Sequence, residues 1–318
     1  MNPLLELETR LQRSLSHTVI GMQDLIRALL IATLSRGHVL VQGAPGLGKT
    51  LLGKTLAAAL GGRFARVQGT ADLMPADITG VHVFDESTRQ FVLHPGPLFT
   101  EILLFDEINR TGPKTQSALL EAMAERQVTI DRTTHRLSPG FLVIATQNPH
   151  EFEGTYPLPE SQLDRFMMRI TVGYPSAEDE AAVLDRYGTV AATGDAAPEH
   201  TLPTPVASAE QLEAARQAAD QVHVAPEVTA YILAIAKASR EDPHIALGLS
   251  SRGALALQRA ARVVAGLRDS GFVTPDDVKL VAPWVIAHRL SLSSEAALER
   301  RTDHALVRSL LERVSVPR

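Results

Sequence analysis

One glycine-rich segment constrains this chain more than any other: Gly43, Ala44, Pro45, Gly46, Leu47, Gly48, Lys49 and Thr50. Apolar residues before it predict a buried strand over 37–42, and the sequence from Leu51 predicts a helix over 51–60. Glycines in such a loop let backbone N–H groups converge on phosphate oxygens at the start of the helix. Lys49 would then reach the β- and γ-phosphates, and the Thr50 hydroxyl would bind Mg²⁺. The segment therefore predicts a nucleoside triphosphate site, the alternative being a plain glycine-rich turn.

A second stretch supplies the acids that such a site needs. The apolar run 102–105 predicts a buried strand, and Asp106 and Glu107 follow directly at its carboxyl end. Asp106 would hold Mg²⁺, and Glu107 would orient and polarise the attacking water. Two acids after an apolar strand are common by chance, but their place after a phosphate loop makes the pattern specific.

A third polar position follows another predicted strand, over 140–148. Asn148 at its end is placed to sense the γ-phosphate or its attacking water, or else it caps a turn before Pro149. Near the N-terminus, Ile20 and Gly21 precede a predicted helix over 22–35. They would pack on an adenine ring or simply belong to the core.

Composition limits the remaining possibilities. The 318 residues are enough for two domains, and the absence of cysteine excludes disulfides, thiolate metal sites and cysteine nucleophiles. The longest early apolar run, 28–34, is too short to span a membrane. A net charge of −5 gives no general attraction to nucleic acid. We expect a cytoplasmic protein.

The pattern of elements predicts an α/β domain over 1–190, a linker over 191–207 and a helical domain over 208–318. Two hairpins interrupt the first domain, one with strands over 81–84 and 90–93, the other with strands over 127–131 and 135–138. The helical domain is expected to contain helices only, over 210–221, 226–240, 251–269, 275–288 and 295–313.

Taken together these stretches resemble an AAA+ ATPase, and more closely the MoxR family. The matching runs are 43–50, 104–110 (LFDEINR), 145–149 (ATQNP) and 162–166 (QLDRF). The resemblance implies a three-layer sandwich around a parallel sheet with two hairpin inserts, followed by an all-α lid. It also implies that 43–50 is Walker A, Asp106 and Glu107 are Walker B and Asn148 is sensor 1.

The same resemblance assigns two arginines. Arg165 takes the place of the arginine finger, which reaches the nucleotide of a neighbouring subunit, where a guanidinium stabilises charge on the transferring phosphoryl group. The alternative is a surface arginine paired with Asp164. Arg252 takes the place of sensor 2, a second contact to the γ-phosphate, although an arginine at a helix start is equally often solvated.

The function implied by this resemblance is Mg²⁺-dependent hydrolysis of ATP to ADP in a homo-oligomeric ring, expected to be a hexamer. That hydrolysis would remodel a client protein, often with a von Willebrand factor A domain partner. Two alternatives stay open. One is a motor stimulated by nucleic acid, which the acidic balance disfavours, and the other is a slow ATP-gated scaffold or switch.

Overall fold

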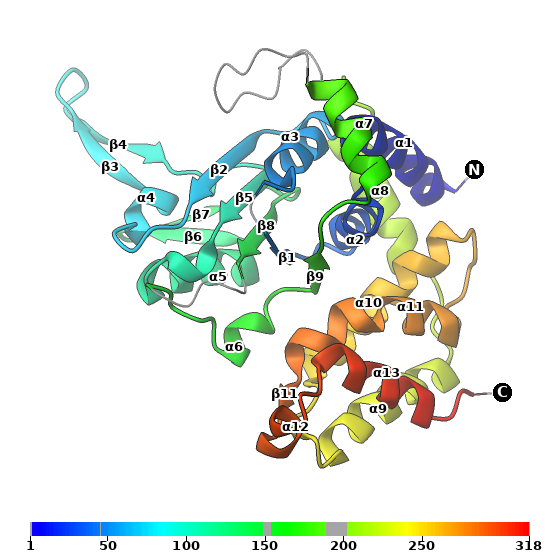
Figure 1. Ribbon diagram of the computed structural model, residues 1–318. Helices are drawn as coiled ribbons and strands as arrows, with labels where there is room; N and C mark the ends of the chain where they lie inside the picture. The colour runs from blue at the N-terminus through cyan, green and yellow to red at the C-terminus, as the bar shows by residue number, and fades with distance from the viewer. Residues whose placement is uncertain (1, 45, 149–153, 189–201, 318) are drawn as a thin grey trace.

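The computed structural model describes residues 2–44, 46–148, 154–188 and 202–317. In these ranges the centre of the N-terminal part is a five-stranded sheet (Figure 1). All its strand pairs are parallel. The carboxyl ends of the strands therefore lie at one edge, where α/β folds bind ligands. In spatial order the strands are β2 (Phe64–Gln68), β5 (Ile102–Asp106), β8 (Leu142–Gln147), β1 (Val39–Gly43) and β9 (Met168–Val172).

Helices cover both faces of this sheet, which confirms the predicted three layers. Val39 and Val41 of β1 join one apolar cluster with α1 (Pro3–Thr18), α2 (Gln23–Leu34) and α3 (Lys49–Ala59). Leu40, between them, joins the opposite cluster with α5 (Pro113–Glu125). Successive side chains of a strand point to opposite faces, so a continuous apolar strand is buried on both sides. The first part is completed by α4 (Pro75–Thr79), η1 (Ile108–Arg110), α6 (Glu160–Leu163) and α7 (Ala177–Tyr187).

Both predicted hairpins are present. The first, β3 (Gly80–Asp85) with β4 (Gln90–Pro95), projects from the sheet (Figure 1), and its Phe91 is 72% exposed and packs edge-on against Phe84. The second, β6 (Gln127–Ile130) with β7 (Thr133–Arg136), turns one to two residues earlier than predicted. A hydrogen bond of 2.8 Å between His82 Nδ1 and Asp131 Oδ2 connects the two hairpins.

The C-terminal part is mostly helical. Its helices are α8 (Ala209–Asp220), α9 (Pro226–Glu241), α10 (Ser251–Leu267), α11 (Pro275–Ile286), η3 (Ala287–Arg289), α12 (Ser294–Leu298) and α13 (Asp303–Arg313). Two expectations were wrong. A small antiparallel sheet joins β10 (Ile245–Leu247) to β11 (Ser291–Leu292). The predicted helix 295–313 is also two helices, because Arg300 adopts a left-handed conformation and the Thr302 side chain caps a new helix.

The apolar core crosses from the first part into the second. Helix α1 buries Leu4, Leu7, Leu11 and Leu15 in the cluster that also contains residues of α8 and α10. Arg216 of α8 is 2% exposed and donates from Nε to the Thr33 carbonyl of α2 at 3.0 Å. The division at 191–207 stays a prediction, and residues 191–201 of that linker lie outside the described ranges. Across the described residues, no helix combines the length and apolar character needed to cross a membrane.

Candidate nucleotide site

The glycine-rich loop connects β1 to α3. Gly46 and Gly48 have φ angles of 81° and 80°, in the left-handed region that glycine enters without steric cost. Gly48 is the residue before α3, so the N–H groups of the first helical turn, which have no partner inside a helix, begin at this loop. Ala44 lies within the loop, whereas Pro45 falls outside the described residues.

Lys49, the first residue of α3, turns back over the loop. Its Nζ donates a hydrogen bond of 3.0 Å to the Gly43 carbonyl. Burial lowers the pKa of Lys49, and the carboxylates of Asp106 and Glu107 act in the opposite direction. The ammonium therefore shares a half-buried space with two acids, where a polyphosphate would compete for it.

Asp106, the last residue of β5, is held from two sides. The Thr146 hydroxyl of β8 donates to Oδ1 at 2.5 Å, and Arg66 Nη2 of β2 lies 2.9 Å from Oδ2. The same hydroxyl accepts from the Glu107 N–H at 2.8 Å. Neighbouring parallel strands thus bring these groups together at one edge of the sheet.

Glu107 follows Asp106 in a left-handed backbone conformation, with φ of 56°. Such a conformation costs a non-glycine residue about 1–3 kcal/mol and is found most often at functional sites. Its Oε2 accepts from Gln68 Nε2 at 2.9 Å and from Arg110 Nη1 at 3.2 Å. The carboxylate is therefore held by two side chains, one from β2 and one from η1.

We call the space around these groups the phosphate pocket; its volume is about 310 Å³. It brings together most of the residues predicted from the sequence and includes Asn148. The lining residues are Gly43, Gly46, Leu47, Gly48, Lys49, Thr50, Arg66, Gln68, Asp106, Glu107, Thr146 and Asn148. The sequence reasoning missed Arg66, Gln68 and Thr146. Arg66 and Gln68 could have been found from their place at the carboxyl end of β2, the strand that pairs with β5.

The donor set of this pocket fits a magnesium ion. Thr50 offers a hydroxyl oxygen and Asp106 a carboxylate, and Mg²⁺ prefers few protein oxygens together with phosphate oxygens and water. Arg66 already pairs with Asp106, so a magnesium ion would share this carboxylate with the guanidinium or displace it. Among the described residues, no group of three or more His, Asp or Glu is placed to hold a metal ion.

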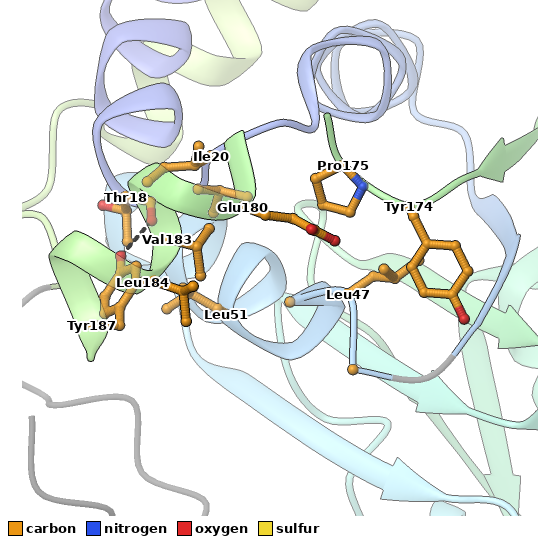
Figure 2. A pocket seen from close by; sticks show the side chains of 13 residues that line it. Thr18, Ile20, Leu47, Leu51, Tyr174, Pro175, Glu180, Val183, Leu184 and Tyr187 are labelled. Atoms are coloured by element: carbon orange, nitrogen blue, oxygen red, sulfur yellow. Dashed lines mark hydrogen bonds between the residues drawn. The ribbon is translucent and has the colours of Figure 1, made fainter. Parts of the chain in front are cut away.

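An apolar pocket of about 500 Å³ adjoins the phosphate pocket and shares Gly46, Leu47 and Gly48 with it. Figure 2 shows Ile20 from the connection between α1 and α2, Leu51 from α3 and Val183 from α7 around it. Tyr187 Oη of α7 donates to the Thr18 carbonyl at 2.6 Å and fixes one wall. An apolar slot next to a phosphate site suits a nucleotide base.

Gly21 does not line this pocket. Its φ is 75°, and a Cβ there would lie 3.0–3.1 Å from the side chain of Asp179 on α7. Gly21 therefore lets the chain after Ile20 pass close to α7, and of the two residues expected at the base only Ile20 lines the space.

Arg165 and Arg252 line neither of these pockets. They meet in a third space of about 360 Å³, here called the arginine pocket. Its lining includes Gly37 and His38, which precede β1, and Met167, which precedes β9. The phosphate pocket lies beyond the other end of β1, and five residues of strand span about 16 Å. The two pockets thus occupy opposite edges of the sheet and have no lining residue in common.

The side chain of Arg165 does not pair with Asp164, as one sequence alternative proposed. Arg165 Nη1 donates to the Leu120 carbonyl of α5 at 2.8 Å. Asp164 instead binds Arg289 of η3, with Nε to Oδ1 at 2.6 Å. That alternative is wrong because the carboxylate is taken up by the C-terminal part of the molecule.

Comparisons with known proteins agree with this geometry. A family model described as the ATPase family associated with various cellular activities (AAA) matches residues 38–168, and one for the AAA lid domain matches residues 237–310. The crystal structure of a Cytophaga hutchinsonii protein described as an ATPase has a TM-score of 0.90 and 34% sequence identity. The similarity covers 99% of this chain and 97% of that one.

Relatives match nearly the full length. The chain is 38% identical to Chaperone MoxR1 of Mycobacterium tuberculosis, over 94% of this chain and 79% of the relative. It is 34% identical to Protein MoxR of Paracoccus denitrificans, over 95% of this chain and 92% of that protein. The chain is 41% identical to the uncharacterized Bacillus subtilis protein YeaC, over 95% of this chain and 92% of that protein. Fold, loop geometry and these relatives lead to one conclusion: the chain belongs to the MoxR family of AAA+ ATPases.

Proposed function

We propose that this protein hydrolyses ATP with Mg²⁺ in a homo-oligomeric ring, a hexamer, and uses the hydrolysis to remodel partner protein complexes. One observation carries the proposal. The groups that bind and attack a triphosphate lie at one edge of the sheet, and the arginines suited to stabilise its transition state lie at the other. A ring in which one subunit's arginine pocket faces the next subunit's phosphate pocket would complete the site.

Within the phosphate pocket each group has a distinct role. The loop 43–50 and Lys49 hold the phosphates, and Thr50 with Asp106 would hold Mg²⁺, which would neutralise charge on the β- and γ-oxygens. Glu107 orients and polarises the attacking water, and Asn148 positions that water or the γ-phosphate. The apolar pocket with Ile20 and Leu51 takes the adenine base.

Arg165 and Arg252 act on the nucleotide of the neighbouring subunit. Both line the arginine pocket, which shares no residue with the phosphate pocket of the same chain, and this supports a role at the neighbour's nucleotide for Arg252 as well. A guanidinium at the transferring phosphoryl group contributes about 10³–10⁵ in rate. A subunit without a neighbour would therefore bind ATP and turn it over poorly.

Two observations support a protein client: one relative is named Chaperone MoxR1, and the β3–β4 hairpin has exposed aromatic side chains. The β3–β4 hairpin exposes Phe84 and Phe91 at 50% and 72%. Exposed aromatic residues on a projecting hairpin suit a contact with a client protein. A von Willebrand factor A domain protein as partner and a cytoplasmic location remain predictions from the family resemblance and the composition.

The test is steady-state ATP turnover per subunit as protein concentration rises, with Arg165→Ala alongside. A shared site predicts that specific activity rises with concentration. The substitution should abolish that activity while ATP binding, followed by a fluorescent ATP analogue, is retained. Activity that is independent of concentration and of Arg165 would mean that each subunit works alone.

A slow ATP-gated switch is the second candidate, and the contacts of Glu107 favour it. Gln68 and Arg110 both hold the Glu107 carboxylate, which must be free to accept a proton from water. Turnover would then stay slow until a partner or nucleotide releases Glu107. Single-turnover and steady-state rates measured with and without a partner would separate a switch from a motor.

A further inference from the structure

Arg289 is a buried cation at the contact between the two parts of the molecule. Its side chain is 2% exposed. Besides binding Asp164 Oδ1, it donates from Nη2 to the Phe166 carbonyl at 2.6 Å and from Nη1 to the Met167 carbonyl at 3.1 Å. The forked guanidinium group of Arg289 therefore holds the segment on either side of Arg165, through the side chain of Asp164 and through two backbone carbonyls.

The same aspartate also binds the helix that carries Arg252. Ser250 Oγ donates to Asp164 Oδ2 at 3.1 Å, and Ser250 caps α10 by accepting from the Gly253 N–H at 3.0 Å. Arg252 is the second residue of that helix. Asp164 thus joins Arg289 and the start of α10, with Arg165 as its neighbour in sequence.

A glycine leaves room for this arrangement. A Cβ on Gly253 would lie 2.7 Å from Arg289 Cδ and 2.5 Å from a side-chain carbon of Leu249, closer than real Cβ contacts. Any larger residue after Arg252 would force the Arg289 and Leu249 side chains, or α10 itself, to shift. The start of α10 is therefore seated directly on the Arg289 side chain.

We propose that Arg289, acting through Asp164, is a positioning residue for catalysis. It fixes Arg165 and Arg252 relative to one another so that both guanidiniums reach one phosphate group of the neighbouring subunit. The inference rests on the proposed function. Without the fork, the two arginines would lie on parts of the molecule that move separately, and a misplacement of about 1 Å costs about 10²-fold in rate.

The experiment mixes two inactive variants. The first carries Lys49→Ala and supplies only an arginine pocket; the second carries Arg165→Ala and supplies only a phosphate pocket. Their mixture should hydrolyse ATP at the interfaces where the first faces the second. Arg289→Lys, which keeps the charge but removes the fork, is then placed in either variant.

In the arginine-supplying subunit, Arg289→Lys should lower kcat of the mixture by about 10²-fold with little change in KM for ATP. In the nucleotide-binding subunit it should leave the rate unchanged, because that arginine pocket is already disabled. Asp164→Asn should behave in the same way as Arg289→Lys. An equal fall in kcat with Arg289→Lys in either subunit would mean that Arg289 only supports folding. No fall in kcat in either case would also overturn the proposal.

A second ion pair between the two parts is the matched control. Arg169 of β9 pairs with Asp303 of α13, and its side chain is 12% exposed. Arg169→Lys in the arginine-supplying subunit should leave the mixture active. A fall as large as that for Arg289→Lys would overturn the specific role of Arg289. If the two parent variants do not complement one another at all, the shared site itself is wrong.

Discussion

The phosphate pocket and the arginine pocket differ in how they balance charge. In the phosphate pocket Lys49 and Arg66 lie with Asp106 and Glu107, so two cations meet two acids. Among the described lining residues of the arginine pocket, six arginines meet a single acid, Asp164. Arg36 is also paired outside the pocket, with Glu213 and Asp220, but the excess of positive charge remains.

The phosphate pocket thus balances its positive and negative side chains, whereas the arginine pocket has an excess of positive charge. The first can exist in a lone chain, and a nucleotide must compete with its internal ion pairs. The second gains stability when a polyphosphate approaches, since like charges in a shared space destabilise one another. Changes in the two pockets should therefore have different consequences, which four predictions make measurable.

The largest effect is expected in the phosphate pocket. Glu107→Gln should lower ATP turnover by about 10²–10⁴-fold, because the proposed general base is lost while the backbone and the proposed metal ligands remain. ATP binding should persist. Rapid-quench and equilibrium binding measurements check both, with Glu121→Gln on the exposed face of α5 as the control. Wild-type turnover in this variant would show that Glu107 is not the base.

The next effect tests the arginine pocket. Arg252→Ala should lower turnover at saturating ATP by about 10²-fold, the usual cost of removing one group that stabilises the transition state. Arg259→Ala, two turns along α10 and also lining the pocket, should cost less. If Arg252→Ala lowers turnover as much in subunits diluted to monomers as in the assembled protein, Arg252 acts on the nucleotide of its own chain. The arginine pocket would then not need a neighbouring subunit.

Acid should destabilise the arginine pocket through His38, which lines it. His38 is buried, accepts from the Val143 N–H through Nδ1 and lies 3.2 Å from the Met123 carbonyl through Nε2. Burial, then the charge of Arg126, lowers the pKa of His38 from 6.5 to about 3. The unfolded chain therefore takes up the proton first, and stability that is complete above pH 6.5 falls as the pH drops toward 3.

Lowering the pH from 7.5 to 5.5 should decrease the free energy of unfolding by about 1.4 kcal/mol through His38 alone. Urea unfolding at the two pH values measures it. His38→Gln should reduce the pH dependence without removing it, because the pKa of buried His288 is also lowered, by burial and then by Arg289. An unchanged slope would mean that folding does not lower the pKa of His38.

The smallest effect concerns the hydrogen bond between Gln68 and Glu107, the proposed general base. Gln68→Ala removes a hydrogen bond of 2.9 Å to Glu107, and one such bond contributes about 0.5–1.5 kcal/mol. Basal turnover should rise about two- to tenfold if that bond restrains the base. Gln90→Ala, on the exposed hairpin, is the control. Lower turnover would instead mean that Gln68 helps to orient Glu107 for the reaction.

The sequence predicted the positions of the glycine-rich loop and of Asp106 and Glu107, three strands of the sheet and both hairpins, because each depends on residues close together in the chain. It could not predict that Arg66 approaches Asp106 across the sheet, or that Asp164 binds Arg289, 125 residues away. Those contacts depend on strand order and on how the lid docks. The β10–β11 sheet was missed for a related reason: its strands of three and two residues carry too little periodicity to detect.

The core that crosses between the two parts also bears on how the protein is made. Helix α1 packs against α2 and α3, which follow it directly, and against α8 and α10, which are synthesised some two hundred residues later. Asn2 Nδ2 donates to the Gly266 carbonyl across 264 positions. Leu4, Leu7, Leu11 and Leu15 are therefore fully buried only when both sets of helices have packed against α1. The nascent chain can thus cover part of this helix early with α2 and α3, but it completes the burial only after α8 and α10 have been made.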